Sequence, residues 1–465
     1  MYHRPVSFHS LTLAAFASLF LAGCGSDSDS NLSSDTPPQI PEEAVLPLVF
    51  VHGGAGSASQ YLSQAMRFAS NGYPEDLIFA FEYHGIAPHN PDVLDAYIDN
   101  VLEQTGADQV YLVGHSMGTF VGYSGPLSAT TMYEGYLMQP EKAAKVARYI
   151  GLDGRSSEEC PGGVPCMGIF NNEEDGVVGT NTLYFTDQEH VEVATSGESF
   201  AAQFEFLTGV EPSTTEIIPQ EGTVTVSGRS VIFPNNTGAE GGTLQIWAVD
   251  SDTGHRTDEE PLGTFEIDAD GWWGPVELDP QTHYEWTLAR DGLHTVHYYR
   301  QPIPRNTNMI RLNASAEGSL ITANTNHGPD HSILVVTRDA EWVAVAEEGE
   351  RDELWISTVS PQWGNQTQVN AIVEGATNAN IALHLHDAEG TPATTTLDLL
   401  DYFPGLAFQS GVDVYMPAYL QDGKPDGTIR IRSIPRGDAT ATQVIQVPNW
   451  PSDNHRMSVI FNDWW

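Results

Sequence analysis

The chain has 465 residues, enough for two or three domains with separate cores. It carries 62 acidic residues against 19 Lys and Arg, which gives a formal charge of -43 at pH 7. Because a nucleic-acid partner requires clustered basic residues, this composition excludes one.

The first 23 residues have the pattern of an export signal. Arg4 precedes an apolar run over residues 11–22, which is too short to span a bilayer in the mature protein. The run ends in Leu21-Ala22-Gly23-Cys24, which resembles the lipobox of bacterial lipoproteins. The alternative is an ordinary secretory signal that ends near a cysteine. The resemblance implies a signal peptide over residues 1–23 and acylation of Cys24. It also implies a membrane anchor in the bacterial cell envelope, at the outer membrane, unless the protein is released outside the cell.

Residues 24–45 are small, polar and Pro-bearing, so we expect a flexible tether there.

Residues 46–221 alternate between strand-like and helix-like segments. The expected strands cover residues 46–51, 77–81, 110–113, 149–152, 167–170 and 182–185. Helix-compatible runs cover residues 60–70, 92–104, 119–123 and 141–148. Thr195 and Glu198 form a capping box for a last helix that Gly209 ends. Such alternation predicts a mostly parallel sheet with helices on both faces.

After residue 221 the segments become short, alternating and rich in β-branched and aromatic residues, which predicts an all-β region. We place a β-sandwich domain at residues 222–304 and a second β-rich domain at 305–465. Strands in the second domain are expected at residues 332–337, 341–346, 353–358, 380–386 and 428–434.

The run Gly114-His115-Ser116-Met117-Gly118 directly follows the expected strand at 110–113. Gly-x-Ser-x-Gly in this position is the signature of the nucleophile elbow of an α/β-hydrolase, which predicts Ser116 as the nucleophile. In such an elbow the next residue, Met117, supplies one backbone N–H to an oxyanion hole. The Gly-rich turn after the first strand predicts the N–H of Gly54 as the second donor.

The base of a serine hydrolase of this fold follows the last strand of the sheet. His190 lies in that position, and no other His occurs between His115 and the end of this domain. Two acids keep the chain order Ser, Asp, His: Asp153 after the strand at 149–152, and Asp175 after the strand at 167–170. Spacing alone leaves both open as the third member of the catalytic triad.

Cys160 and Cys166 bracket a turn-rich loop and are expected to form a disulfide in an oxidising compartment. They have no His nearby to complete a zinc site. Asp268, Asp270 and Asp387 show no calcium-ligand spacing. The prediction therefore contains no metal and no cofactor.

Residues 46 to about 222 resemble microbial true lipases, in particular archaeal lipases with a C-terminal β-rich lipid-binding domain. The segments that carry the resemblance include Val51-His52-Gly53, Phe81-Glu82-Tyr83, Leu152-Asp153-Gly154 and His190-Val191, besides the elbow. It implies Asp153 as the acid, with Gly54, Met117 and His190 in the roles given above. The chain departs from the family in a lid shortened to residues 85–92 and an insert at 125–135.

The expected function is a serine carboxylester hydrolase of the lipase or esterase class that forms an acyl-enzyme on Ser116. Its substrate would be an ester lipid, and the resemblance implies that the C-terminal region binds lipid or another insoluble substrate. One alternative is an extracellular polyester depolymerase with the same triad. Another is a non-catalytic surface-binding lipoprotein with a relic hydrolase domain.

Overall fold

The computed structural model describes residues 37–83, 91–123, 129–131, 136–174, 176, 178–344, 351–361, 364–373, 379–390, 399–400 and 408–462. The predicted signal peptide, Cys24, the first part of the tether and Asp175 lie outside these residues, as do most of the shortened lid and of the insert. In the described part, no helix is both long enough and apolar enough to cross a membrane.

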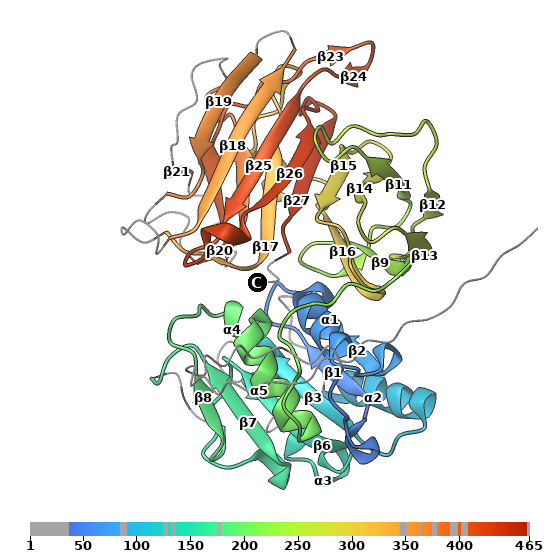
Figure 1. Cartoon of the computed structure of the whole chain (residues 1–465), viewed down its shortest axis with the longest axis vertical. Helices are drawn as coiled ribbons and strands as arrows, with labels where there is room; N and C mark the ends of the chain where they lie inside the picture. The colour runs from blue at the N-terminus through green and yellow to red at the C-terminus, as the bar shows by residue number, and fades with distance from the viewer. Residues whose placement is uncertain are drawn as a thin grey trace, which may run out of the picture. The chain divides into compact units, whose positions relative to one another are not determined.

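Residues 46–221 contain a six-stranded sheet in the order β2-β1-β3-β6-β7-β8, in which every neighbouring pair is parallel (Figure 1). Its strands are β1 (Leu48–Val51), β2 (Ile78–Phe81), β3 (Val110–His115), β6 (Val146–Leu152), β7 (Cys166–Phe170) and β8 (Thr182–Tyr184). The larger helices are α1 (Leu62–Ser70), α2 (Pro91–Thr105) and α5 (Gly197–Thr208). The predicted α/β fold class is confirmed.

The two faces of this sheet are covered by different helices. Side chains alternate along β1, so Leu48 and Phe50 pack with α1 and α5, whereas Val49 and Val51 pack with α2 on the other face. This two-sided burial explains why the strands are nearly continuous apolar runs in the sequence.

Three local predictions differ from the structure. Residues 119–123 form no helix: a 3₁₀ turn η4 (Ser116–Thr119) is followed by strand β4 (Phe120–Tyr123), which pairs with β5 (Ala129–Thr131). The helix expected at 141–148 is only α3 (Pro140–Ala143), because β6 begins at Val146 to pair with β3. The last helix is capped by the hydroxyl of Ser196, which accepts the Ser199 N–H, rather than by Thr195. Gly209, with φ of 77°, ends that helix as expected.

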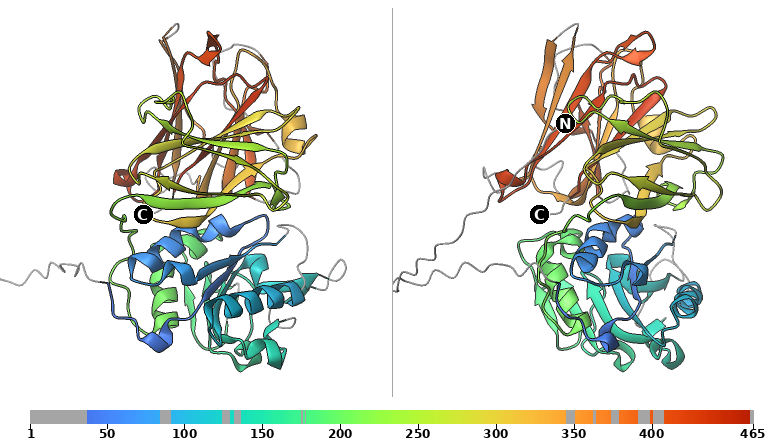
Figure 2. Two further views of the ribbon diagram at one scale, coloured as in Figure 1. Left: turned by 90° about the vertical axis from the view of Figure 1, so that its right-hand side faces the viewer. Right: turned by 45° about the vertical axis from the view of Figure 1, so that its right-hand side comes forward.

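Within the described residues, the β-rich region contains one nine-stranded sheet, two four-stranded sheets and a two-stranded sheet of β23 (Leu420–Gln421) and β24 (Lys424–Pro425). Figure 2 shows this region from two further sides. The nine-stranded sheet runs in the order β12-β11-β14-β15-β27-β17-β20-β22-β21. Its strands are β11 (Thr243–Val249), β12 (Gly263–Glu266), β14 (His283–Ala289), β15 (Thr295–Arg300), β17 (Leu334–Trp342), β20 (Asn380–His386), β21 (Leu399–Leu400), β22 (Gln409–Asp413) and β27 (His455–Ile460). Residues 332–337 and 341–346 were expected as two strands, but the single strand β17 runs through the gap between them.

Along the chain, the strands of the four-stranded sheets are interleaved with those of the nine-stranded sheet. One contains β9 (Val224–Ile232), β10 (Thr237–Gly238), β13 (Trp272–Leu278) and β16 (Thr307–Ala314). The other contains β18 (Glu353–Ser360), β19 (Gly364–Asn370), β25 (Thr428–Ile434) and β26 (Gln443–Pro448). Two pairings cross the boundary at residue 304 that the sequence predicted: β16 is parallel to β9, and β15 is parallel to β27. The β-rich region is therefore joined by backbone hydrogen bonds across that position.

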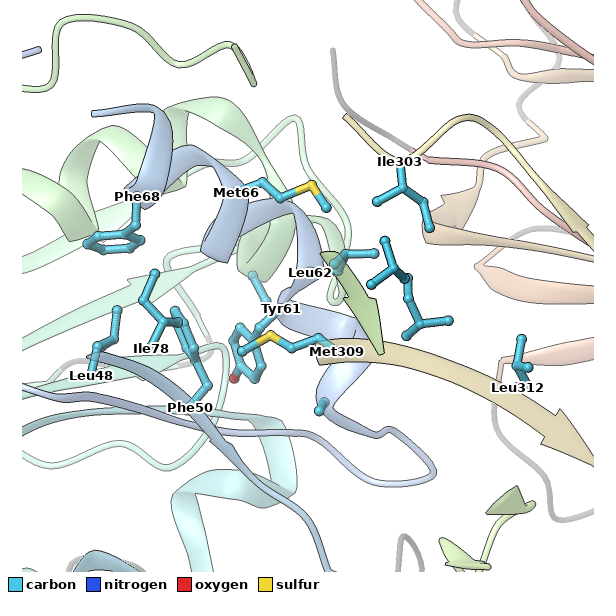
Figure 3. Close-up of a cluster of buried hydrophobic side chains, with 14 of the residues drawn as sticks. Leu48, Phe50, Tyr61, Leu62, Met66, Phe68, Ile78, Ile303, Met309 and Leu312 are labelled. Carbon is cyan, nitrogen blue, oxygen red and sulfur yellow. The ribbon is translucent and has the colours of Figure 1, made fainter. Parts of the chain in front are cut away.

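One hydrophobic core extends from the hydrolase sheet into the β-rich region (Figure 3). Leu62 and Met66 of α1 belong to the same buried cluster as Ile303, Met309 and Leu312. The two regions thus share apolar burial, the largest favourable term in folding.

Candidate active site

The predicted site residues follow the carboxyl ends of parallel strands of the six-stranded sheet. Gly54 follows β1, Ser116 follows β3, Asp153 follows β6 and His190 comes after β8. Because all these strands are parallel, their carboxyl ends share one edge of the sheet, where α/β proteins bind ligands.

Ser116 lies in a strained turn. Its φ is 49°, in the left-handed region that residues other than glycine rarely adopt. The glycines on either side are required by packing: a Cβ on Gly114 would lie 2.8 Å from the carbonyl oxygen of Gly118, and one on Gly118 would lie 2.2 Å from that of Val51. This close approach is the one that the sequence pattern predicted.

His190 Nδ1 and Asp153 Oδ2 form a hydrogen bond. The Asp153 side chain is only 5 % exposed and that of His190 is 30 % exposed. The other carboxylate oxygen, Oδ1, accepts the Asn171 N–H at 3.2 Å, so both oxygens of Asp153 are engaged. An acid held in this way orients the imidazole and stabilises its protonated form.

The half-buried Gln60 and the buried His115, for which the sequence predicts no role, connect the Gly-rich loop to residue 190. The side chain of Gln60 accepts the Gly53 N–H at 3.0 Å and donates to His115 Nδ1 at 2.6 Å. His115 Nε2 then donates to the backbone carbonyl of His190 at 2.9 Å. Burial, together with His190, lowers the pKa of His115 well below its usual range, so the ring stays neutral and keeps one donor and one acceptor nitrogen.

The same loop is held from the β-rich region by Asn236. Its side-chain amide donates to the backbone oxygens of Gly56 and Tyr83 at 2.9 and 3.0 Å. The sequence gives no signal for this contact, because the two segments are 180 positions apart.

Several residues with strained backbone conformations lie in or next to this site. Of the seven residues other than glycine with positive φ in the described part of the chain, Ala55, Ser116 and Asp153 lie in the site loops. Two more touch the site, since Asn236 bonds to the Gly-rich loop and the Phe408 ring stacks on that of His190 at 5.7 Å and 6°. Such clustering is typical of functional sites.

A cavity of about 220 Å³ joins Gly54, Ser116 and His190 to the nine-stranded sheet of the β-rich region. The register places the wall residues on one face of that sheet: Val296 pairs with Arg456, and Val335 pairs with both Ser458 and His384. The opposite face, which includes Val336 and Val459, packs into a separate apolar core. The β-rich region therefore forms one wall of the candidate site.

The predicted disulfide between Cys160 and Cys166 is present, with the two Cα atoms 5.5 Å apart. Within the described ranges, no group of three or more His, Cys, Asp and Glu side chains is arranged to hold a metal ion.

Comparison with known proteins finds family models that match both the hydrolase domain and the β-rich region. Residues 48–203 match the model of the alpha/beta hydrolase family, residues 222–317 match the lipase C-terminal domain, and residues 320–465 match a further C-terminal domain model. A 92-residue segment, 19 % of the chain, is 33 % identical to the sn-1-specific diacylglycerol lipase ABHD11 of Danio rerio. The match spans only 29 % of that relative's length.

Two solved structures show lower similarity. The Bacillus licheniformis lipase BlEst2 in propeptide form is 11 % identical, with 89 % of this chain and 95 % of that chain covered and a TM-score of 0.27. The Pseudomonas aeruginosa PAO1 protein PA1622 is 19 % identical, with 26 % of this chain and 39 % of that chain covered and a TM-score of 0.17. Since both TM-scores are low, the assignment rests on the family models and the sheet topology. Residues 48–203 therefore form an α/β-hydrolase domain, and the residues that follow it match the model of a lipase C-terminal domain.

Proposed function

We propose that the protein is a serine carboxylester hydrolase that uses Ser116 as nucleophile, His190 as base and Asp153 as the orienting acid. In this mechanism His190 removes the proton of the Ser116 hydroxyl as its oxygen attacks the ester carbonyl carbon. The N–H groups of Gly54 and Met117 stabilise the resulting oxyanion. His190 then protonates the leaving alcohol, and water attacks the acyl-enzyme in a second cycle of the same steps.

The observation that carries this proposal is the hydrogen bond between Asp153 and His190, beside a strained Ser116 that lines the same cavity as His190. Ser116 and Asp153 both have positive φ, and both follow strands that pair with each other. A loop without catalytic function has no need of two such strained residues side by side.

The proposal predicts that a fluorophosphonate probe labels Ser116 covalently and that p-nitrophenyl esters are hydrolysed. Ser116→Ala should abolish the labelling and reduce kcat by on the order of 10⁶-fold, because triad members act as a unit. A wild-type protein that neither reacts with the probe nor turns over esters would instead support the relic-domain alternative.

The choice of acid predicts a second result. Asp153→Asn should lower kcat by about 10⁴-fold, because the imidazole loses the partner that fixes its tautomer. Asp175→Asn is the matched comparison, and we expect it to stay within a few-fold of wild type. A large loss in Asp175→Asn alone would transfer the role to that residue.

Polyester depolymerase activity is the second candidate function, and the cavity wall favours it. The face of the sheet that lines the cavity carries polar side chains, among them Thr337, His384, Gln409 and Ser458, as well as apolar ones. Further carbonyl groups along an oligoester chain would find hydrogen-bond donors there, and the apolar side chains would contact the hydrocarbon segments between them. Clearing of a polyester emulsion, compared with release of fatty acid from a long-chain triacylglycerol, distinguishes the two substrates.

We also propose that Cys24 is acylated and anchors the protein to the bacterial cell envelope. The support for this proposal is the Leu21-Ala22-Gly23-Cys24 sequence after a short apolar run. Metabolic labelling with palmitate in a bacterial host should mark the wild type and not Cys24→Ser. Labelling of both proteins, or of neither, would contradict the anchor.

A further inference from the structure

A buried carboxylate of the β-rich region bonds to the backbone just after the candidate base. Glu341, on β17, is fully buried. Its Oε1 accepts the Val191 N–H at 2.6 Å and its Oε2 accepts the Glu192 N–H at 3.2 Å. Both carboxylate oxygens thus hold the segment through which the chain leaves His190.

The backbone around His190 is held on its other side as well. His115 donates to the carbonyl oxygen of His190, and Asp153 bonds to its ring. Phe408, also from the β-rich region, stacks on that ring. With Glu341 bound to the next two amides, the residue has little freedom to rotate or shift.

We propose that Glu341 is a positioning residue for catalysis: its carboxylate, supplied by the β-rich region, fixes the 190–192 backbone and so keeps the His190 ring aligned with Ser116. This inference rests on the proposed function, because it assigns His190 as the base. It makes the β-rich region part of the catalytic framework in addition to a wall of the cavity. Misplacement of a catalytic group by about 1 Å can cost about 10²-fold in rate.

The role is best served by ionised Glu341, because a carboxylate accepts through two charged oxygens, whereas the hydroxyl oxygen of the protonated acid is a weak acceptor. Burial raises the pKa of Glu341 to about 7, although the two backbone N–H groups and His190 lower it. The groups of the hydrolase domain that act on the Glu341 carboxyl are His190 and the Glu192 N–H. Arg338 and Asp339 lie on β17, the strand that carries Glu341. Arg436 pairs with both Glu192 and Asp352, and Asp352 also pairs with Arg338. As the pH falls through 7, a protonated Glu341 becomes a donor on one oxygen and loses one of its two bonds.

Amide hydrogen exchange tests the contact without relying on activity. In the full-length protein at pH 8, Glu341→Gln should speed exchange at Val191 or Glu192 by at least about tenfold, since an amide has a single acceptor oxygen. In the wild type, protection of these two amides, referenced to those of α5, should fall as the pH is lowered from 8 to 6. This wild-type series keeps the test valid even where the variant folds poorly.

Kinetics tests the consequence for catalysis. With p-nitrophenyl butyrate, Glu341→Gln should lower kcat by about 10- to 100-fold with little change in KM. In the pH profile of kcat, the fall on the acid side should reflect protonation of both His190 and Glu341 in the wild type, and of His190 alone in the variant. Arg436→Met is the matched control, because it removes another contact between the β-rich region and the segment after His190. Its kcat and the slope of its acid limb should match wild type.

The results separate this inference from the proposed function. Unchanged exchange at both amides, or equal losses of kcat in Glu341→Gln and Arg436→Met, would overturn the positioning role. Faster exchange in Glu341→Gln together with an unchanged kcat would overturn it as well. Absence of ester hydrolysis and of Ser116 labelling in the wild type would overturn the proposed function, and with it the catalytic role of Glu341, whereas the exchange result would still report on the contact itself.

Discussion

His115, a variable residue of the Gly-x-Ser-x-Gly motif, has a structural role that the motif does not predict. In the pattern Gly-x-Ser-x-Gly its position is one of the two variable ones, yet the side chain is buried between Gln60 and the carbonyl of His190. Gly53 fits beside it only because it lacks a side chain, since a Cβ there would lie 2.8 Å from His115 Nδ1. The elbow is therefore packed against the Gly-rich loop through this imidazole.

Replacing His115 by Leu, a side chain of similar volume without hydrogen-bonding groups, tests this role. The variant leaves the Gln60 amide and the His190 carbonyl without their partner, so we expect a loss of about 1–3 kcal/mol in the free energy of unfolding. Urea denaturation at pH 8 measures it. The folded-state pKa of His115 is depressed, so its stabilisation is present above the unfolded value of 6.5 and fades as the pH falls below it. The difference between the two proteins should therefore shrink at pH 5, and a constant difference would contradict this account.

At the scale of elements, a buried ion-pair cluster joins the end of β2 to β9 and β16. Glu82, just after β2, accepts from Arg311 Nε at 2.6 Å and Nη2 at 3.0 Å, and from Arg229 Nη1 at 2.6 Å. Burial alone would raise the pKa of Glu82, but the two arginines lower it to about 2. A two-pronged contact of this kind fixes orientation as well as distance between the elements.

The substitution Arg311→Met should cost about 3–5 kcal/mol of unfolding free energy at pH 7, because it leaves the buried carboxylate with one of its two arginines. Since the folded-state pKa of Glu82 is lowered, this stabilisation is complete above pH 4.5 and is lost as the pH falls towards 2. Chemical denaturation should show a large difference in unfolding free energy between the wild type and Arg311→Met at pH 7, and a small one at pH 3.

Arg305→Met is the matched control for that cluster. Arg305 also pairs across the two regions, with Glu75 at 3.0 Å, but the Glu75 side chain is 33 % exposed. A solvated pair of this kind contributes about 1 kcal/mol or less. Similar losses of unfolding free energy in Arg311→Met and Arg305→Met would show that the buried Glu82 cluster stabilises the fold no more than an exposed ion pair does.

At the scale of the whole molecule, the hydrolase domain shares its hydrophobic core and its site contacts with the β-rich region. The core around Leu62 and Met66 is completed by Ile303 and Met309, and the site loops are held by Asn236 and Glu341. Ending the chain after residue 221 exposes that apolar surface and removes both polar contacts. We expect the truncated protein to aggregate or to lose cooperative unfolding.

Size-exclusion chromatography and thermal unfolding of the truncated protein, beside the full chain, check this expectation. A monomeric fragment that unfolds cooperatively and hydrolyses p-nitrophenyl butyrate at the wild-type rate would contradict it. That outcome would also remove the basis for treating the β-rich region as part of the catalytic framework.

The features that could be predicted from the sequence are those encoded in neighbouring residues. The tight elbow, the Cys160–Cys166 pair and the helix end at Gly209 each depend on a few adjacent positions and on steric or covalent rules. The α/β fold class followed from apolar runs long enough to show their period. The error at residues 119–123 arose because pairing with β5 overrode a local helix-compatible pattern.

The sequence by itself determined the class of fold and the segments from which the site is drawn, because local sterics and hydrophobic period are properties of short stretches of chain. Only the tertiary structure decided what surrounds those segments. Glu341 meets Val191 across 150 positions, and Arg311 meets Glu82 across 229. No periodicity links residues so far apart, since such contacts arise only when separate sheets pack and bring their faces together.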